Sequence, residues 1–256
     1  MTVRDATVGP LLGGRVAFVT GAGSGIGRAI AGLFAAEGAA VAALDVNGPA
    51  AVETAAEIAS HGGRSVALPA DVSRFEDVRE AVARAESALG PITALVNAAG
   101  LLRDKTIANL SETDWDLVVD VHLKGTFLCT KLVAGRMREG GAGGSIVNLS
   151  SISGKVGPFG QANYAAAKAG IVALTKVTAR EFARFGVRAN AIQPGMIDTP
   201  MTRTLGQEHL TRAAAETPLG RLGRPGEVAS VALFLASELA SYVTGAVVEV
   251  TGGRFL

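Results

Sequence analysis

The chain has 256 residues, 48% of them hydrophobic, which suits one α/β domain with a large buried core. Its formal net charge of +1, without a clustered Lys/Arg tract, excludes recruitment of nucleic acid or an anionic membrane surface by a strong positive field. No apolar run reaches the roughly 18 residues of a membrane span, and the single cysteine, Cys129, excludes an intrachain disulfide and predicts a cytoplasmic protein.

Residues 1–14 are interpreted as an N-terminal extension, and residues 15–256 as a single domain. The apolar run from Arg15 to Thr20 predicts a buried strand, followed by the turn Gly21-Ala-Gly-Ser-Gly-Ile-Gly27 and a helical pattern over residues 28–37. This order indicates phosphate binding, because glycines let the backbone approach a pyrophosphate and the helix start offers free N–H groups. The spacing departs from G-x-G-x-x-G, so a tight turn without a ligand is the alternative.

A second strand is predicted over residues 40–45, and Asp45 ends it. A carboxylate eighteen residues after Gly27 can accept hydrogen bonds from the hydroxyls of an adenosine ribose, and it would repel a 2′-phosphate. The glycine turn contains no arginine that would offset this repulsion, which favours NAD over NADP as the cofactor. The alternative is that Asp45 or Asn47 caps the helix that begins near Pro49.

Strands and helices continue to alternate along the chain. The predicted strands are 65–70, 92–97, 145–149, 187–193 and 246–250, and the predicted helices are 50–61, 73–89, 111–137, 159–185 and 225–236. Ser73 is expected to be an N-cap, in a capping box with Glu76. Short connections imply an α/β fold with a doubly wound, seven-stranded parallel sheet and helices on both faces. Residues 196–218 are polar and bounded by prolines, which predicts a substrate lid.

Tyr164 and Lys168 are four residues apart in an alanine-rich stretch, so a helix would bring both side chains to one face. A free tyrosine has a pKa of about 10 and is a poor base at neutral pH. An ammonium at ~4 Å would stabilise the phenolate by roughly 4 kcal/mol at an effective dielectric constant of ~20, or about 3 pKa units. The pair therefore predicts a general acid/base, the alternative being a chance spacing on an amphipathic helix.

From about residue 13 to residue 253, the sequence resembles the short-chain dehydrogenase/reductase family. The motifs that carry the resemblance are Thr20-Gly-Ala-Gly-Ser-Gly-Ile-Gly27, Asp71-Val72, Asn97-Ala-Ala-Gly100, Ser151, Tyr164-x-x-x-Lys168 and Pro194-Gly-Met-Ile-Asp-Thr199. Within the family, the stretch from Gly160 to Lys168 is most similar to the branch of 3-oxoacyl-[acyl-carrier-protein] reductases and secondary-alcohol dehydrogenases. The resemblance implies a Rossmann-type fold.

The resemblance also implies a role for each motif. Tyr164 would exchange the proton with the substrate oxygen, Lys168 would lower the pKa of Tyr164 and hold the nicotinamide ribose, and Ser151 would hydrogen-bond the substrate oxygen. Ser150 and Ser153 are alternatives for that serine. The implied cofactor-binding residues are Gly21, Ser24, Gly25, Ile26 and Gly27 at the pyrophosphate, Asp45 at the ribose, Asp71 and Val72 at the adenine, Asn97 and Gly100 in the cleft, and Pro194, Ile197 and Thr199 near the nicotinamide.

One position departs from the family's pattern. A stretch like Val-Asn-Leu-x-Gly is usual in the long central helix, whereas this chain has Val121-His-Leu-Lys-Gly125. The family's asparagine links the lysine to solvent through a water. We expect His122 to replace it in a proton relay, because histidine donates or accepts hydrogen bonds and titrates near neutral pH; the alternative is a packed histidine. The three histidines, His61, His122 and His209, show no metal-ligand spacing, so no metal is predicted.

The sequence therefore predicts an NAD-dependent oxidoreductase that interconverts a secondary alcohol and a ketone. A 3-oxoacyl-[acyl-carrier-protein] or 3-oxoacyl-CoA reductase is the first alternative, with Arg136, Arg138, Arg180 and Arg184 as candidates for docking an acidic carrier. A dinucleotide sensor without catalysis is an alternative of another class. The expected substrate is a small, largely apolar molecule. The apolar helices 112–137 and 159–185, with the last strand, suggest a homotetramer by analogy with the family.

Overall fold

The computed structural model describes residues 9–255 and contains one parallel sheet. Its strands are β1 (Val16–Thr20), β2 (Ala40–Asp45), β3 (Ser65–Pro69), β4 (Ala94–Asn97), β5 (Gly144–Leu149), β6 (Val187–Pro194) and β7 (Val247–Val250). Their spatial order is β3-β2-β1-β4-β5-β6-β7, which confirms the predicted doubly wound, seven-stranded sheet. The strand order reverses between β1 and β4, and in such sheets ligands bind at the carboxyl ends of the strands beside this reversal.

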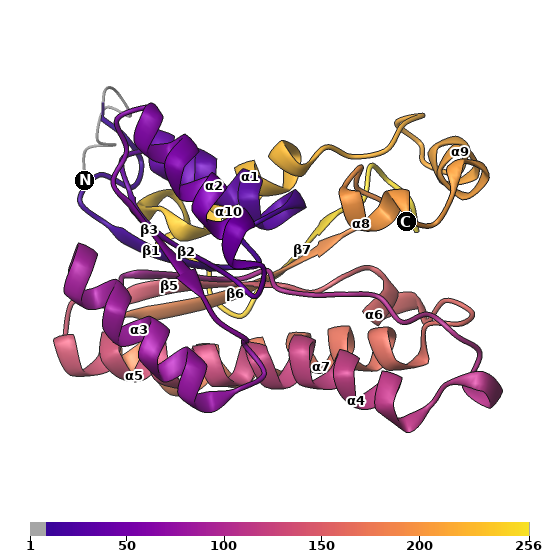
Figure 1. Ribbon diagram of the computed structural model, residues 1–256, viewed down its shortest axis with the longest axis horizontal. Coiled ribbons are helices and arrows are strands. Elements are labelled where there is room, and N and C mark those ends of the chain that lie inside the picture. Colours follow the sequence, from indigo (N-terminus) through magenta and orange to yellow (C-terminus); the bar gives the residue numbers. More distant parts are fainter. Residues whose placement is uncertain (1–8, 256) are drawn as a thin grey trace.

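Helices cover both faces of the sheet (Figure 1). The long ones are α1 (Gly25–Ala36), α2 (Gly48–Ser60), α3 (Phe75–Leu89), α4 (Glu112–Val119), α5 (Gly125–Gly140), α7 (Ala162–Phe182) and α10 (Pro225–Ala236). On one face, α1 and α10 bury Ile30, Phe34 and Leu233 against the sheet. On the other, α3 and α5 bury Val82 and Val133. The strands β1, β2, β4, β5 and β6 are buried on both sides, which explains why they read as continuous apolar runs, whereas the edge strands β3 and β7 are only partly buried.

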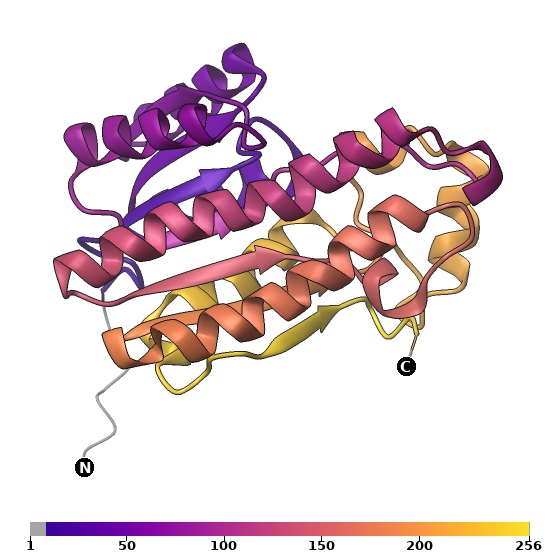
Figure 2. The same ribbon diagram turned by 90° about the horizontal axis from the view of Figure 1, so that it is seen from below.

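The long central helix predicted over 111–137 is continuous but not uniform. Ser111 is its N-cap and accepts a hydrogen bond from the N–H of Asp114. Between α4 and α5, the segment η2 (Asp120–Lys124) is a π-helical turn, and His122 lies in its middle. Such turns accommodate one extra residue and re-aim the neighbouring side chains, and they are frequent at functional sites. Figure 2 shows α5 and α7 lying side by side along this face of the molecule.

Several predicted helix starts differ from the structure by two or three residues, and two of these differences concern predicted motifs. The first helix begins at Gly25, three residues before the predicted start, so the second half of the glycine turn forms its first turn. The predicted capping box of Ser73 and Glu76 is wrong, because the N-cap of α3 is Arg74. The Ser73 hydroxyl instead donates to the Asp71 carboxylate at 2.7 Å, which closes the turn after β3.

Short helices complete the chain. They are η1 (Ile107–Asn109), α6 (Ser153–Val156), η3 (Ala183–Phe185), α8 (Pro200–Arg203), α9 (Gln207–Ala215) and η4 (Glu238–Ala240). The predicted lid contains α8 and α9, which project beyond the carboxyl end of the sheet (Figure 1). The predicted N-terminal extension falls partly outside the described residues, and within them Leu12 is buried in the core. Within residues 9–255, no helix combines the length and apolarity needed to cross a membrane.

Candidate active site

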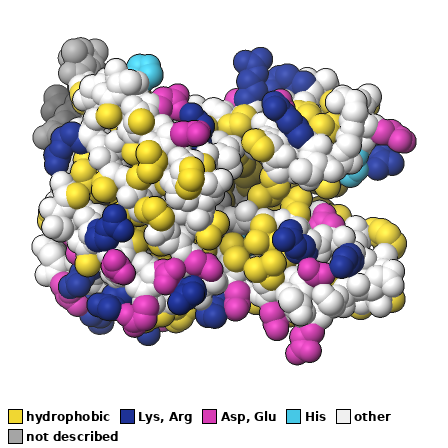
Figure 3. All heavy atoms as spheres, in the orientation of Figure 1, with side chains coloured by type: hydrophobic (Ala, Val, Ile, Leu, Met, Phe, Trp, Pro, Cys, Tyr) yellow, Lys and Arg dark blue, Asp and Glu magenta, His cyan; other side chains and the backbone are white. Residues whose placement is uncertain are grey.

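A cavity of about 410 Å³ opens at the carboxyl ends of the strands, beneath the lid. Figure 3 shows the surface hollowed here, with apolar side chains in the hollow. Sixteen predicted site residues line it: Gly21, Ser24, Gly25, Ile26, Gly27, Asp45, Asp71, Val72, Gly100, His122, Ser151, Tyr164, Lys168, Pro194, Ile197 and Thr199. The fold thus brings together residues that lie as far apart in the sequence as Gly21 and Thr199.

Two glycines of the turn, Gly21 and Gly27, leave no room for a side chain. A Cβ on Gly27 would lie 2.0 Å from the Gly21 carbonyl oxygen, and a Cβ on Gly21 would lie 2.8 Å from the Ala99 Cα. Gly21 also has a φ of +66°, in the left-handed region that favours glycine. The Ser24 side chain makes no capping hydrogen bond to α1. The first N–H groups of this helix can therefore serve an anion bound at the turn.

Asp45 lies against the glycine turn. One carboxylate oxygen accepts a hydrogen bond from the Gly23 N–H at 2.9 Å, and the other accepts from the Asn47 N–H at 2.9 Å. The N-cap of α2 is Asn47, which accepts from the Ala50 N–H. Capping thus belongs to Asn47, whereas Asp45 fixes the turn to the end of β2 and presents its negative charge on the cavity wall.

Asn97 is the exception among the predicted cofactor-binding residues, because it lies behind the wall of the cavity. It is 4% exposed and absent from the cavity lining. Its amide nitrogen donates to the side chains of Asn148 at 2.8 Å and Thr130 at 3.2 Å, so it joins β4 to β5 and α5. The expectation that Asn97 lines the cleft is therefore wrong. The wall here is formed by the three residues that follow it, Ala98, Ala99 and Gly100.

Ser151, Tyr164 and Lys168 meet at the floor of the cavity. Lys168 is 5% exposed and donates a hydrogen bond from Nζ to the Leu149 carbonyl at 2.6 Å. Its Nζ lies 5.5 Å from the centroid of the Tyr164 ring. Ser151 lines the cavity with Tyr164 and its hydroxyl lowers the pKa of that tyrosine, whereas the Ser150 hydroxyl donates to the Lys168 carbonyl at 2.7 Å and Ser153 lies outside the cavity lining. Of the candidate serines, Ser151 is therefore the one that the geometry places with the tyrosine.

The pKa values of Tyr164 and Lys168 differ from the sequence-based expectation. Burial raises the pKa of Tyr164 to about 12, although the Ser151 hydroxyl opposes the rise. Burial also lowers the pKa of Lys168 to about 7. The expected fall in the pKa of Tyr164 is thus wrong for this structure, because both groups lose water and burial favours the neutral form of each. Tyr164 is therefore a protonated donor at neutral pH.

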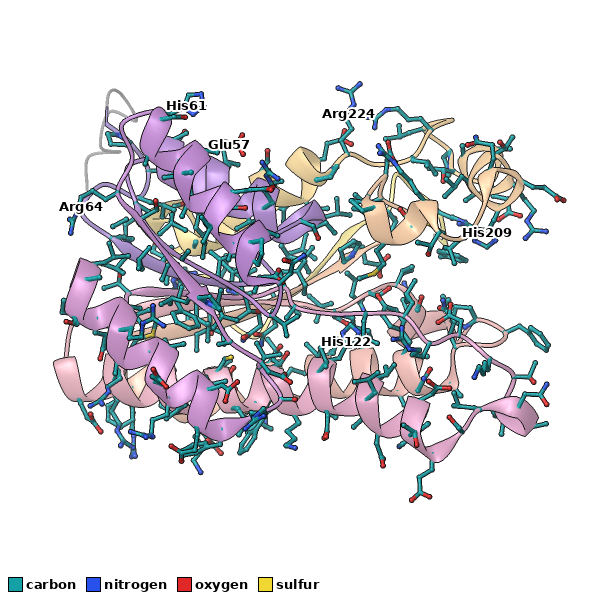
Figure 4. All side chains as sticks on the ribbon, viewed as in Figure 1. Glu57, His61, Arg64, His122, His209 and Arg224 are labelled. Carbon is teal, nitrogen blue, oxygen red and sulfur yellow. The ribbon has the colours of Figure 1, made fainter. Side chains whose placement is uncertain are left out.

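His122 is 2% exposed, and its ring meets the Tyr164 ring edge-on with centroids 5.1 Å apart. Nε2 lies 2.8 Å from the Leu101 carbonyl oxygen and 3.1 Å from the Leu101 nitrogen, while Nδ1 is buried without a hydrogen-bond partner. Burial, together with the positive charge of Lys168, lowers the pKa of His122 to about 3. The expectation that His122 titrates near neutral pH is therefore wrong. Figure 4 shows His122 in the lower layer beside the cavity, apart from His61 and His209.

The lid side of the cavity is fixed by a small hydrogen-bond network. The Thr202 hydroxyl donates to the Ile197 carbonyl at 2.6 Å and accepts from the Thr199 N–H at 3.0 Å. The sequence analysis did not identify Thr202 or the Leu149 carbonyl as part of the site. A threonine three residues after Thr199 fits a capping box, and this pattern could have indicated Thr202. No sequence pattern marks the Leu149 carbonyl, because it is a backbone oxygen.

The cavity fits a dinucleotide. A tight glycine turn, open N–H groups at a helix start, and a carboxylate at the end of the second strand lie along one wall. Within residues 9–255, no three His, Cys, Asp or Glu side chains are grouped so that they could hold a metal ion. The residues that could bind a cofactor are thus those of the glycine turn, Asp45 and the Ile197–Thr199 segment.

Comparison with known proteins gives consistent matches over nearly the whole chain. A family model described as Enoyl-(Acyl carrier protein) reductase matches residues 21–254. The (3R)-3-hydroxyacyl-CoA dehydrogenase of Mus musculus is 47% identical over 94% of this chain and 96% of its own length. The 3-oxoacyl-[acyl-carrier-protein] reductase of Thermotoga maritima is 43% identical over 94% of this chain and 98% of its own length. A crystal structure of a short-chain type dehydrogenase/reductase from Mycobacterium marinum superposes with a TM-score of 0.92 at 33% identity. The superposition covers 95% of this chain and 96% of that one.

Proposed function

Because the chain belongs to the short-chain dehydrogenase/reductase family, and is thus an oxidoreductase acting on a CH–OH group, we propose that it interconverts a 3-oxoacyl thioester and its 3-hydroxy form with NAD(H). The observation that supports this most directly is the meeting of Ser151, Tyr164 and Lys168 in one cavity with the glycine turn and Asp45. When bound, a nicotinamide dinucleotide supplies or accepts the hydride.

This chain's own residues supply orientation and the proton. In the direction of reduction, the Tyr164 hydroxyl donates its proton to the substrate oxygen, and the Ser151 hydroxyl donates a hydrogen bond to the same atom. Lys168 is held by the Leu149 carbonyl at the floor of the cavity, where its amino group faces the tyrosine ring. Tyr164 is fully protonated at neutral pH, so its hydroxyl has a proton to donate in the direction of reduction.

The thioester is preferred to a simple secondary alcohol or ketone for two reasons. Relatives that share close to half of their residues with this chain are named for 3-hydroxyacyl-CoA and 3-oxoacyl-carrier substrates. The cavity also has an apolar side, formed by Leu101, Leu117, Val121 and Met201, that suits an acyl chain. Val156 and Phe159, in the segment after Ser151, are 40% and 93% exposed and lie outside the cavity lining.

A coenzyme A thioester is the first choice within this class. The arginines that were candidates for docking a carrier protein lie at the far ends of α5 and α7. Arg136 is fourteen residues after His122, about 21 Å along the helix, and it pairs with Glu86 and Glu139. Arg184 stacks on Phe185. These arginines therefore face away from the cavity of the same chain.

The test is the absorbance of the nicotinamide during turnover. NADH and NADPH are each tested with 3-oxoacyl-CoA, 3-oxoacyl carrier protein and simple ketones, and NAD with secondary alcohols. We expect the highest kcat/KM for NADH with 3-oxoacyl-CoA. The variant Tyr164→Phe should lose about 10³-fold in kcat while still binding NADH, because it lacks only the proton donor. The matched control is Tyr242→Phe, since Tyr242 is the only other tyrosine and is fully exposed.

Other results would select the alternatives. A higher kcat/KM for simple secondary alcohols than for the thioesters would indicate a general secondary-alcohol dehydrogenase. A preference for the carrier-bound substrate would indicate a reductase that depends on an acyl carrier protein. A protein that binds NADH, turns over none of these substrates and keeps its biological activity in the Tyr164→Phe variant would be a sensor.

A further inference from the structure

Asn163 lies immediately before Tyr164 at the start of α7, and it is completely buried. Burying an amide costs free energy unless its oxygen and its N–H groups find partners. The partners of Asn163 are all backbone groups. Its Oδ1 accepts a hydrogen bond from the Tyr164 N–H at 2.8 Å. Its Nδ2 donates to the carbonyls of Arg103 and Asp114, each at 3.2 Å. One side chain therefore joins three segments of the chain.

Each of these segments also forms part of the cavity. Leu101 precedes the first bonded carbonyl by two residues, and Leu117 follows the second by three; both belong to the apolar side that suits an acyl chain. The third segment contains Tyr164, the proposed proton donor. Figure 1 shows α4 beside α7 in the layer below the sheet, where the two helices pack together. Asn163 thus lies at the junction between the apolar side of the cavity and the tyrosine.

A second amide side chain supports the same junction. The Gln161 side chain does not cap α7 but donates to the Asp104 carboxylate at 2.6 Å, and the backbone of Gln161 pairs with that of Lys105. The charge of Asp104 reaches Tyr164, because burial raises the pKa of this tyrosine and the Asp104 carboxylate raises it further. Residues 103–105 are therefore held along the start of α7, within electrostatic range of the tyrosine.

A junction of this kind controls orientation. The Tyr164 hydroxyl transfers its proton only from hydrogen-bond distance of the substrate oxygen. A misplacement of about 1 Å can lower the rate about 100-fold. An acyl chain held by Leu101 and Leu117 brings the 3-oxo group to that distance only if the apolar side keeps its place relative to the tyrosine. The hydrogen bonds of Asn163 fix this relative placement, because they connect the backbones of both parts.

We propose that Asn163 is a positioning residue for the 3-oxoacyl substrate, which holds the apolar side of the cavity at a fixed distance from the Tyr164 hydroxyl so that a bound acyl chain directs the 3-oxo group to its proton donor. This inference rests on the proposed function and deepens it, because it assigns a preference for longer acyl chains to this junction. Asn163 is absent from the cavity lining, so it acts through the backbone of its three partners.

Asn163→Ala removes all three hydrogen bonds, and Asn190→Ala is its matched control. Asn190 is also buried, and its amide serves the Val243 carbonyl and the Ala246 N–H, but it lies outside the cavity lining. Both variants should unfold at a lower urea concentration than the wild type. Only Asn163→Ala should lower kcat with 3-oxooctanoyl-CoA, by about 30-fold. Its dissociation constant for NADH should stay within about twofold, because the glycine turn keeps its contacts.

The length of the acyl chain separates positioning from a general loss of structure. In the wild type, kcat/KM should rise from acetoacetyl-CoA to 3-oxooctanoyl-CoA, because the added methylene groups are buried on the apolar side. In Asn163→Ala, kcat for acetoacetyl-CoA should fall by no more than about threefold, because the short chain makes little use of that side. The kinetic advantage of the longer chain should thus shrink about tenfold, whereas a purely structural role would lower both activities by the same factor.

Gln161→Ala tests the same junction without opening the core, because it removes only the outer bond to Asp104. We expect kcat with 3-oxooctanoyl-CoA to fall about fivefold, and kcat with acetoacetyl-CoA by no more than about twofold. Amide hydrogen exchange in residues 101–106 should be faster in Asn163→Ala and in Gln161→Ala than in the wild type, and unchanged in Asn190→Ala.

Several results would overturn the proposal. Equal losses with both thioesters in Asn163→Ala, or the same loss in Asn190→Ala, would mean that Asn163 only stabilises the fold. A wild type whose kcat/KM does not rise with chain length would contradict an apolar side that binds the acyl chain. If ketones but no thioesters were reduced, the proposed function would fail, while the same comparison of acetone with 2-octanone would still decide the role of Asn163. If no substrate were turned over, unchanged hydrogen exchange in Asn163→Ala would by itself refute the junction.

Discussion

At the scale of the residue, burial decides the chemistry of the side chains in this cavity. Tyr164 and Lys168 lie in one cavity, as their spacing on a helix predicts, yet loss of water shifts both pKa values toward the neutral forms. His122 shows the same effect most strongly, because it is enclosed and lies near a cation. The identity of a side chain therefore indicates which proton it can exchange, and its surroundings set the pH at which it does so.

The low pKa of His122 makes stability depend on pH. Its folded-state pKa of about 3 lies below the ordinary histidine value of 6.5, so the unfolded chain binds a proton first as the pH falls. The free energy of unfolding should therefore drop below pH 6.5. Between pH 7 and pH 4 the loss attributable to His122 is about 3 kcal/mol. Urea unfolding at both pH values, at one protein concentration, measures it. His122→Asn should lack this part of the loss, and the exposed-site control His61→Asn should retain it.

We propose that Asp45 sets the choice of cofactor by its charge. The variant Asp45→Asn keeps an acceptor oxygen for the Gly23 N–H but removes the negative charge beside the ribose site. Repulsion between a carboxylate and a 2′-phosphate is of the order of 2 kcal/mol. We therefore expect the ratio of kcat/KM for NADPH to that for NADH to rise about 30-fold. Steady-state kinetics with both cofactors checks this, and an unchanged ratio would assign Asp45 only to holding the glycine turn.

At the scale of the element, helix ends and one helix irregularity form the site. The start of α1 lies at the glycine turn, and η2 places His122 opposite Tyr164. At the lid, the segment from Ile197 to Thr202 forms a capping box that begins α8. These irregular segments are held by a few hydrogen bonds each, so single substitutions should change their geometry more than substitutions within a regular helix.

The Thr202 hydroxyl is the centre of the lid network. We expect Thr202→Val to weaken NADH binding about tenfold, because the Ile197 carbonyl and the Thr199 N–H lose their partner and the segment beside the cofactor loosens. The control is Thr204→Val, whose exposed hydroxyl bonds only the Met201 carbonyl. Tryptophan or NADH fluorescence titration measures both dissociation constants. Similar losses in the two variants would show that the network does not position the cofactor.

At the scale of the whole molecule, the exposed apolar side chains include two sets on the elements that the sequence suggests for subunit contacts. One is formed by Trp115, Phe127 and Val177 on α4, α5 and α7, which lie along one face (Figure 2). The other includes Phe234, Leu239 and Tyr242 near the last helix and strand. Exposed apolar clusters of this kind mark interfaces. We propose that both are covered in a homotetramer, since a closed assembly of four chains needs more than one interface.

Val177 tests this proposal. The wild type should elute with four times the mass of one chain in size exclusion with light scattering, and Val177→Glu should yield dimers or monomers, because it buries an unpaired charge in the interface. The control is Val52→Glu on α2, because Val52 is 55% exposed and Val177 is 50% exposed. A monomeric wild type, or dissociation caused equally by both variants, would contradict the assignment of this surface.

The sequence by itself determined the architecture and most of the site. Apolar runs and glycine stops predict all seven strands, because strand burial depends on local composition. Motif spacing predicts that Gly21, Asp45, Tyr164 and Lys168 converge, because the carboxyl ends of parallel strands share one edge. Each of these inferences depends on residues that are neighbours in the chain or on the general topology of the fold.

Only the tertiary structure decided where burial and long-range contacts act. Asn97 lies behind the cavity wall, because its side chain is hydrogen-bonded to Asn148 and Thr130. The tertiary structure supplied the Leu149 carbonyl to Lys168, and it kept His122 neutral. The physical reason is that solvent access, and hence each pKa and free hydrogen-bonding group, depends on atoms from several distant segments. A sequence pattern fixes which groups arrive at the site, and packing fixes which of them still meet water, cofactor and substrate.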